Sequence, residues 1–329
     1  MRAVVLESYG EPDVLRVSDI PDPEPGPDEV VVDLVATALN RADLLQRRGF
    51  YPGPPLRYGG QVLEVPGLEF SGRVAATGER VTEVDVGAEV MGIVGGGSYA
   101  ERLVTHERQV MPVPASVAVD VAAAIPEVFI TAYDALVLQG GLTSGRTALV
   151  HAGASGVGTA AILLCRAIGA RIVVTASGGK IDRCGELGAD VAVDYRSEDF
   201  AAAALEATGG EGVDVVLDVV GGEYLGRNLS CVRERGVIVQ VGVMGDAGAS
   251  LNLGALLGKR AAIVGTTLRR RPIEEKIAVT RRFASEVLPL FDAGRLHPVI
   301  DSRFPLEEAA AAHARMEANA NVGKILLDV

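Results

Sequence analysis

The chain has 329 residues, of which 48% are hydrophobic, 22% are charged and 40 are glycine. This length and composition are typical of a globular protein with two domains and many tight turns, and they exclude disordered, fibrous and small disulfide-stapled proteins. The formal net charge of −12 disfavours nucleic acids and anionic membrane surfaces as partners.

From Met1 to about Ala122, short strand-like runs alternate with turn residues, which predicts a largely β domain. Pro21–Pro27 and Pro52–Pro55 are expected to be loops, because proline cannot donate to a central strand. Asn40–Arg48 is expected to form one short helix. The expected strands are Ala3–Leu6, Glu29–Ala36, Gly72–Thr77, Ala88–Ile93 and Tyr99–Thr105.

From about Ala123 the pattern changes to apolar runs separated by helix-length segments, which indicates a doubly wound parallel sheet. Ile273–Phe291 is expected to be helical, and the tail after His297 to contain a helix and a last strand, Lys324–Val329, that rejoins the first domain. We therefore predict an α/β protein with a mostly β domain (1–122 and 290–329) and a dinucleotide-binding domain (123–289). The six expected parallel strands are Thr147–His151, Arg171–Thr175, Val191–Asp194, Val213–Val219, Gly236–Val241 and Ala262–Gly265.

The longest uncharged stretch, Thr147–Cys165, contains polar residues and three glycines, which favours a buried strand and helix over a membrane span. The N-terminal residues lack the pattern of an export signal, so we expect a cytoplasmic protein. Cys165, Cys184 and Cys231 are an odd number at wide spacing, and we expect buried, reduced thiols.

The strongest chemical signal is the segment His151–Gly158, which follows a strand and opens a helix expected over Val157–Ile168. Closely spaced glycines let a backbone turn sharply and approach a pyrophosphate, whose charge then lies at the helix N-terminus. We expect a dinucleotide to bind here; the alternative is a purely structural glycine turn. The expected cofactor-binding residues of this loop are Gly153, Ser155, Gly156, Val157 and Gly158.

The end of the second strand of this domain indicates which dinucleotide binds. An NAD site carries an acid there for the ribose hydroxyl, whereas this sequence continues with Ser177 and Lys180. We expect these two residues to bind the 2′-phosphate of NADPH, and the alternative for Lys180 is a solvated lysine. One charge-assisted hydrogen bond is worth about 1.5–3 kcal/mol, which is enough to decide the preference.

Five segments together carry a resemblance to a known family: Leu39–Asp43, Pro66–Gly72, Ile125–Glu127, Gly153–Gly158 and Asn321–Ile325. The chain resembles, nearly end to end, the NADPH-dependent, zeta-crystallin-like quinone oxidoreductase branch of the medium-chain dehydrogenase/reductase superfamily. The resemblance implies a GroES-like catalytic domain, a Rossmann-type domain with NADPH, and reduction of quinones or other α,β-unsaturated carbonyls. It also implies a homodimer, for which an edge strand such as the one expected over residues 262–265 is suitable.

The zinc alcohol dehydrogenases of this superfamily hold a catalytic zinc with a Cys, a His and a second Cys. In this sequence Asn40 and Leu68 stand at the first two positions, and Glu127 stands approximately at the third. Asn40 and Leu68 cannot form the usual nitrogen and sulfur site, so we expect no metal. Conjugated acceptors are then the easier substrates, because the charge that hydride brings is delocalised over the acceptor.

The resemblance places Asn40, Tyr51 and Thr131 around the nicotinamide and the acceptor as candidate catalytic residues. Asn40 offers both a donor and an acceptor, with a helix N-cap as the alternative role. Tyr51 looks like the tyrosine that related enoyl reductases use as proton donor, and its alternative role is a loop anchor.

Further cofactor contacts are implied by the resemblance along the rest of the chain. We expect Tyr195 to lie at the adenosine end, and Gly242 and Met244 to lie under the nicotinamide ribose. Asn319 and Lys324, in the tail, are expected to close over the cofactor, and Leu268 is a further expected contact. By contrast, we expect His151 to be a satisfied side chain, Glu69 to tie backbone groups together, and Arg269–Arg271 to be solvated or close to the cofactor phosphates.

Two other functions stay open from the sequence. One is an enoyl-thioester reductase, which needs a long acyl channel. The other is a non-catalytic protein that binds NADPH or RNA. The net charge disfavours RNA, and the presence of the polar Asn40 and Tyr51 favours catalysis.

Overall fold

A computed structural model describes all 329 residues, and the chain divides into two compact units. Unit 1 comprises residues 1–127 and 269–329, and unit 2 comprises residues 128–268. Unit 2 is therefore an insertion in unit 1, and both ends of the chain belong to unit 1. The mixed α/β architecture predicted from the sequence is confirmed.

Unit 2 is built on one six-stranded sheet in which every pair of neighbouring strands is parallel. The strand order is β12-β11-β10-β13-β14-β15, so β10, the first strand of unit 2 in the sequence, lies in the middle and the order reverses beside it. This reversal is where doubly wound folds bind dinucleotides. The strands are β10 (Thr147–Val150), β11 (Arg171–Ala176), β12 (Val191–Asp194), β13 (Val213–Asp218), β14 (Val232–Gln240) and β15 (Ala262–Gly265).

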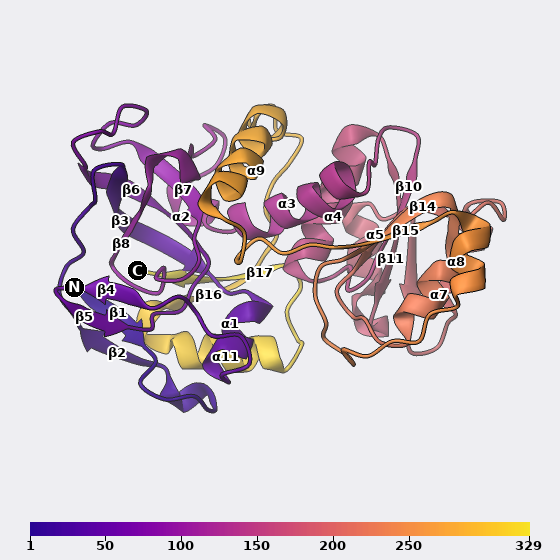
Figure 1. The fold of residues 1–329 in the computed structure, drawn as a ribbon, viewed down its shortest axis with the longest axis horizontal. Helices are drawn as coiled ribbons and strands as arrows, with labels where there is room; N and C mark the ends of the chain where they lie inside the picture. Colours follow the sequence, from indigo (N-terminus) through magenta and orange to yellow (C-terminus); the bar gives the residue numbers. More distant parts are fainter. The chain divides into compact units, whose positions relative to one another are not determined.

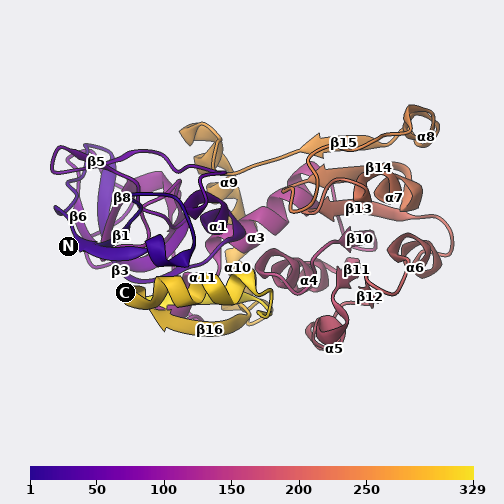
Figure 2. The ribbon, with the colours of Figure 1, turned by 90° about the horizontal axis from the view of Figure 1, so that it is seen from below.

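Helices cover both faces of this sheet. Figure 2 shows α4 and α5 on one face and α6 and α7 on the other. The sheet is packed with β-branched and aliphatic residues such as Val173, Val216 and Ile238, and Phe200 of α6 fills one face. Burial of each such side chain contributes about 1.5–3 kcal/mol. The helices are α4 (Gly156–Ile168), α5 (Ile181–Leu187), α6 (Phe200–Ala207), α7 (Tyr224–Cys231) and α8 (Leu253–Lys259), and α3 (Pro126–Tyr133) continues as a π-helical stretch, Asp134–Gln139.

Unit 1 is built on a seven-stranded sheet of order β16-β17-β3-β6-β7-β9, with β8 paired to β3. The last strand, β17, lies antiparallel to β3 and parallel to β16, so the tail rejoins the first unit as predicted. Two small hairpin-like sheets, β1-β2 and β4-β5, complete it (Figure 1). The strands are β1 (Arg2–Val5), β2 (Arg16–Asp19), β3 (Glu29–Ala38), β4 (Leu56–Tyr58), β5 (Gln61–Leu63), β6 (Glu69–Thr77), β7 (Glu89–Ile93), β8 (Arg102–His106), β9 (Val110–Pro112), β16 (Ile300–Pro305) and β17 (Lys324–Asp328).

The helices of unit 1 are short. Helices α1 and α11 lie side by side in Figures 1 and 2. Buried residues of both belong to a core cluster that includes Leu44, Ala312 and Met316. The helices are α1 (Arg41–Arg47), α2 (Val119–Ala122), α9 (Ile273–Glu286), α10 (Leu288–Asp292) and α11 (Ala309–Glu317).

The structure divides the chain at different points from those expected. The expected nucleotide-binding domain, 123–289, included the long helical segment, whereas the structure assigns residues 269–329 to unit 1. Helix α9 packs there on the residues around β9, and two ion pairs, Arg108–Glu274 and Arg281–Glu83, fix it. The expected single helix Ile273–Phe291 is also divided, at Val287 before Pro289, because proline lacks the N–H that a continuous helix needs.

Two further expectations can be compared with the structure. No helix combines the length and the apolar character that crossing a membrane requires. All three cysteines are buried and free, as predicted, and burial raises the pKa of Cys165 to about 12 and the pKa values of Cys184 and Cys231 to about 11.

Candidate active site

The glycine loop of unit 2 lies at the carboxyl end of β10 and leads directly into α4. A Cβ on Gly153 would stand 2.6 Å from Val174, and a Cβ on Gly158 would stand 2.3 Å from the carbonyl oxygen of Ala152, so both positions require glycine. Ser155 is the N-cap of α4, and its hydroxyl accepts the N–H of Gly158 at 3.0 Å. The loop therefore presents backbone close to a helix N-terminus, as pyrophosphate binding needs.

A buried polar chain fixes the strand ends around this loop. Nε2 of His151 lies 2.7 Å from Asn228 Oδ1, and the Asn228 amide donates to Asp218 Oδ2 at 2.9 Å. The other ring nitrogen lies 3.1 Å from the hydroxyl of Thr175. Because the Asn228 amide nitrogen donates to Asp218, its oxygen faces His151 as an acceptor, so Nε2 of His151 carries the proton. Burial lowers the pKa of His151. These hydrogen bonds connect the ends of β10, β11 and β13. His151 is therefore the satisfied side chain that the sequence predicted.

Ser177 and Lys180 follow β11 in a tight turn, and the turn meets the end of β12. The N–H of Tyr195 donates to Ala176 O at 3.2 Å, so this tyrosine lies beside the end of β11 with its ring partly exposed. The structure also brings an acid here that sequence reasoning missed, since Oδ2 of Asp194 lies 2.5 Å from where a Cβ on Gly178 would stand. A cation and an anion therefore share the expected 2′-phosphate region.

The segment after β14 also follows the carboxyl end of a strand of this sheet. The N–H groups of Met244 and Gly245 donate to the carbonyls of Val219 and Val220, and Met244 is 49% exposed. Gly242 lies beside Val219, and Leu268 is buried. The expected cofactor residues of unit 2 thus come from segments that follow the carboxyl ends of its strands.

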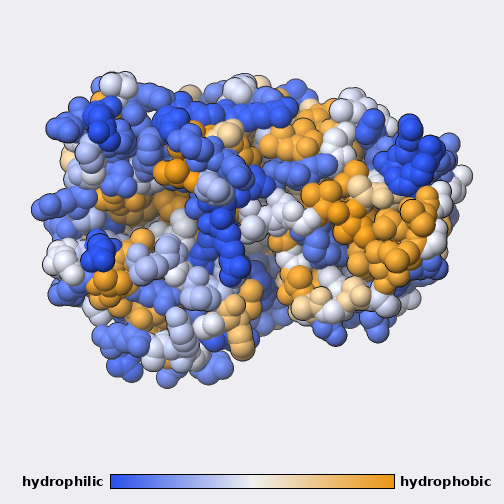
Figure 3. All heavy atoms as spheres, in the orientation of Figure 1, coloured by the Kyte–Doolittle hydropathy of each residue, from blue (hydrophilic) through white to orange (hydrophobic).

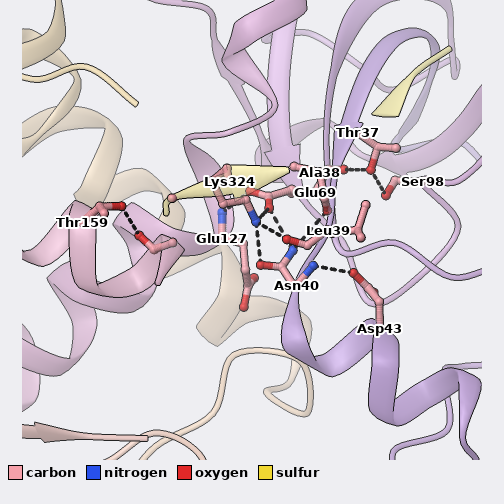
Figure 4. Close-up of polar contacts among 12 residues, drawn as sticks. Thr37, Ala38, Leu39, Asn40, Asp43, Glu69, Ser98, Glu127, Thr159 and Lys324 are labelled. Atoms are coloured by element: carbon pink, nitrogen blue, oxygen red, sulfur yellow. Dashed lines mark hydrogen bonds and ion pairs between the residues drawn. The ribbon is translucent and has the colours of Figure 1, made fainter. Parts of the chain in front are cut away.

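A second polar cluster lies in unit 1, where Asn40, Glu69 and Lys324 meet (Figure 4). The Asn40 amide donates to Glu69 Oε1 at 2.8 Å, and its oxygen accepts from the Lys324 ammonium at 2.9 Å. Lys324 also pairs with Glu69 at 2.7 Å and donates to the carbonyl of Leu39 at 2.5 Å. Asn40 does stand at the N-cap position of α1, but its amide group is held by Glu69 and Lys324.

Glu127 and Asp43 border this cluster. The backbone N–H of Glu127 donates to Glu69 Oε2 at 2.7 Å. Burial, followed by the negative charge of Glu69, raises the pKa of Glu127 to about 8. Asp43 Oδ2 accepts the N–H of Asn40 at 2.7 Å, its Oδ1 has no partner, and burial raises its pKa to about 6. Glu69 thus joins side chains and backbone, and two acids beside it hold their protons more tightly than usual.

Tyr51 lies elsewhere on unit 1, under two arginines. The guanidinium carbons of Arg269 and Arg270 stand 4.9 Å and 5.4 Å from the centre of its ring. Arg269 donates to the carbonyls of Gly95 and Tyr51 and to Gln46 Oε1. Arg269 therefore fixes the loop that carries Tyr51, so it is not a purely solvated residue, whereas Arg270 is exposed; the expected position near the cofactor phosphates stays a prediction.

Thr131 and Asn319 are not among the hydrogen-bonding partners of this cluster. Thr131 is buried in α3 and belongs to unit 2, one helical turn after Glu127. Asn319 follows α11 with a left-handed φ of 51°, which asparagine tolerates, and it accepts a hydrogen bond from Arg41 at 2.7 Å. Of the predicted residues of unit 1, the structure brings Asn40 and Lys324 into contact. The roles of Lys324 and Asn319 toward the cofactor stay predictions.

The positions that hold zinc in the metal-dependent relatives were tested for their donor atoms. Leu68 is a buried hydrocarbon, and both ends of the Asn40 amide are occupied by Glu69 and Lys324. No group of three or more His, Cys, Asp or Glu side chains is arranged to hold a metal ion. This donor set does not fit the usual zinc site.

Sequence reasoning missed several residues of these sites. Asp43, Asp218 and Asn228 gave no signal of their own, because each acts through a partner that the fold alone brings near. Glu127 was named from the sequence as standing approximately at the third ligand position of the zinc enzymes, but no role was assigned to it.

Comparisons with known proteins all point to dehydrogenases and oxidoreductases. A family model described as a zinc-binding dehydrogenase matches residues 187–327, and one described as an alcohol dehydrogenase GroES-like domain matches residues 26–115. The quinone oxidoreductase of Pseudomonas aeruginosa is 33% identical over 99% of both chains.

Solved structures cover the whole chain. The crystal structure of Escherichia coli quinone oxidoreductase complexed with NADPH superposes with a TM-score of 0.87 at 26% identity, covering all of both chains. A crystal structure described as an NAD-dependent alcohol dehydrogenase gives the same TM-score at 33% identity, also over all of both chains.

Proposed function

This chain belongs to the quinone oxidoreductase branch of the medium-chain dehydrogenase/reductase superfamily, and on that premise we propose that it reduces quinones or other α,β-unsaturated carbonyl compounds with NADPH and without a metal ion. Membership supports an oxidoreductase that acts on a small molecule. The acceptor, the choice of NADPH and the independence of metal are the proposed parts.

The residues of unit 2 fit a dinucleotide. The glycines at 153 and 158 let the loop pack closely on Val174 and Ala152 and so bring the chain to the N-terminus of α4, which suits a pyrophosphate. Ser177, Lys180 and Tyr195 would hold the adenosine end with its 2′-phosphate, and Gly242 and Met244 the nicotinamide end. When bound, the reduced nicotinamide supplies a hydride. The NADPH complexes of related structures support this choice of cofactor.

One observation carries the choice of acceptor: the contacts of Asn40, Glu69 and Lys324 include no imidazole or thiolate, the groups that the zinc enzymes use. A simple carbonyl needs a Lewis acid, or several kcal/mol from other sources, to stabilise the alkoxide that hydride addition creates. A quinone or an enone spreads that charge over its conjugated system, so hydrogen bonds and a proton suffice. Tyr51 and Thr131 are proposed to contact the acceptor, with the Asn40 cluster orienting it.

We also propose that two copies pair through β15. This strand is bonded to β14 on one side only, so its other edge is free for a partner. Large apolar side chains are exposed beside it, with Leu253 64%, Leu257 76% and Ile263 36% exposed. Figure 3 shows a continuous hydrophobic area over the part of the face where β15 and α8 lie. Such an area is typical of a protein interface.

The function is tested by following NADPH oxidation with ortho- and para-quinones, enals, enoyl thioesters and saturated ketones. We expect turnover with conjugated acceptors, little or none with saturated ketones, and the same rate after dialysis against a chelator. Turnover with enoyl thioesters alone would favour the thioester reductase, and no turnover with tight NADPH binding would favour a non-catalytic protein. One equivalent of zinc, or loss of the rate on chelation, would contradict the metal-free proposal.

A further inference from the structure

We propose that Glu127 is the proton donor to the acceptor, an inference that rests on the proposed function and adds a residue to it. The family resemblance gives this role to Tyr51. The contacts of the two side chains and the charges around them favour Glu127 instead.

Glu127 has a fixed backbone and an unengaged carboxyl group. Its N–H is held by Glu69 Oε2 at 2.7 Å, at the start of α3. The carboxyl group itself has no hydrogen bond or ion pair, and Figure 4 shows it beyond the bonded cluster of Asn40, Glu69 and Lys324. An acid in such a place keeps its O–H available for another molecule.

The charges that face Glu127 favour its neutral form. Glu69 of β6 and Asp43 of α1 are acidic neighbours, and they act together with burial to raise the pKa of Glu127. Lys324 of β17 and Arg269 lower it, but less than burial raises it. Lys276 of α9 is another neighbouring cation: burial lowers its pKa, and the negative charge of Glu127 opposes that shift. Lys324 is neutralised by its own contact with Glu69, so its influence is partly cancelled.

Asp43 is the other acid in the cluster that could hold a proton. Its side chain is completely buried, and Oδ2 is taken by the N–H of Asn40 and the hydroxyl of Tyr99. A proton on Asp43 therefore has no route to an outside molecule. Glu127 is partly exposed, which lets it give a proton to the acceptor and recover one from water.

The proposed step balances in atoms and electrons. A bound reduced nicotinamide would supply the hydride that adds to the β-carbon of the enone, and the π-electron pair would move onto the carbonyl oxygen of the acceptor as an enolate. The O–H bond of Glu127 breaks and its proton forms a C–H bond at the α-carbon, while the enolate electrons restore the carbonyl. Glu127 is left as a carboxylate and takes a proton from solvent. For a quinone, the same proton goes to the phenolate oxygen.

The first test measures protonation directly in the cofactor-free protein. Infrared difference spectra are recorded as the pH is raised from 6 to 10, for the natural protein, for Glu127→Gln and for Asp43→Asn. We expect a protonated-carboxyl band that disappears around pH 8, is absent in Glu127→Gln, and disappears at lower pH in Asp43→Asn because a negative neighbour is gone. Asp43, whose pKa is raised to about 6, contributes only a band that disappears near pH 6, so a band that still disappears around pH 8 in Glu127→Gln belongs to another acid and overturns the inference.

The second test uses the acceptors that the natural protein reduces. General acids typically contribute about 10²–10⁴-fold, so Glu127→Gln is expected to lower kcat at least about 100-fold and to remove the fall in rate above pH 8. Binding of NADPH, measured by calorimetry, should not change. Glu274→Gln, an exposed acid paired with Arg108, is the matched control and should behave like the natural protein.

Tyr51→Phe separates the two candidate donors. If Tyr51→Phe abolishes enone reduction while Glu127→Gln keeps both its rate and its pH profile, the tyrosine is the donor and the inference is wrong. If the natural protein reduces none of the acceptors, the proposed function fails; the infrared titration still shows whether Glu127 holds a proton, so the two failures are distinguishable.

Discussion

Lys180, which follows β11, and Asp194, at the end of β12, place opposite charges near each other, and we expect their balance to set the preference between the two nicotinamide dinucleotides. Lys180 can pair with a 2′-phosphate, whereas Asp194, against Gly178, repels it. Lys180→Ala is expected to weaken NADPH binding about 10- to 150-fold and to leave NADH binding nearly unchanged. Calorimetric titration with both dinucleotides measures this.

A matched control for that prediction is available in α5, the helix that follows Lys180. Arg183→Ala removes an exposed cation that is already paired with Glu186, so both affinities should stay the same. An equal loss of NADPH and NADH affinity in Lys180→Ala would mean that the lysine supports the loop and does not read the phosphate.

The two acids with raised pKa values predict how stability depends on pH. An acid whose folded pKa is raised stabilises the fold fully below its unfolded pKa and loses that contribution as pH rises through the folded pKa. For Asp43 the window runs from 3.8 to about 6, and for Glu127 from 4.5 to about 8. Between pH 6 and 8, therefore, only the loss of the proton from Glu127, and not that from Asp43, still lowers the free energy of unfolding.

Urea unfolding at pH 6, 7 and 8 checks this. The free energy of unfolding of the natural protein should fall relative to that of Glu127→Gln by at most about 1.4 kcal/mol per pH unit. Parallel pH dependence of the two proteins would show that Glu127 is already charged at pH 6.

At this scale, the sequence predicted residues that belong to continuous motifs and missed those that depend on a distant partner. The loop around Ser155 was found because its glycines, strand and helix are consecutive. The contact between Glu69 and Lys324 was not found, because β6 and β17 meet only through β3 and no local pattern indicates which side chains then face each other.

Among the elements, α4 shows most directly how backbone packing limits the sequence. Gly158→Ala would put a Cβ 2.3 Å from the carbonyl oxygen of Ala152, so the start of the helix must move. We expect a loss of about 1–3 kcal/mol of stability and at least a tenfold loss in NADPH affinity. Urea unfolding and calorimetry measure the two effects.

Gly185→Ala in α5 is the matched substitution. Nothing lies within 4 Å of the Cβ it would add, so alanine should stabilise that helix by up to about 1 kcal/mol and leave cofactor binding as it is. If both variants behave alike, the glycine loop does not depend on the close approach seen at Gly158.

The strands of the parallel sheet were the most predictable elements. All six parallel strands of unit 2 were expected at nearly the observed positions, because each is an apolar run between helices. The short strands β2, β4, β5 and β9 were missed, since three or four residues at a sheet edge carry too little pattern. The place of α9 in unit 1 depends on contacts with residues far away in the sequence, including the burial of Ile277 and Phe283, which a local pattern does not reveal.

For the whole molecule, the free edge of β15 predicts the oligomeric state. Sedimentation velocity should show a species of twice the mass of one chain. Ile263→Lys puts a charge on the edge strand and is expected to give a monomer. Val62→Lys changes an exposed apolar residue of the β4-β5 hairpin, 54% exposed, and should leave the dimer intact. A monomeric natural protein, or a dimer that survives Ile263→Lys, would contradict the pairing through β15.

The position of β17 between β16 and β3 constrains the order in which a newly made chain can fold. Unit 2 is continuous in sequence and can assemble as soon as residues 128–268 have left the ribosome, whereas the sheet of unit 1 lacks an interior strand until residues 324–328 emerge. Until then Glu69 has no lysine to neutralise it. We therefore expect the first half of unit 1 to wait as an open sheet during synthesis, a state in which chaperones would find exposed strand edges.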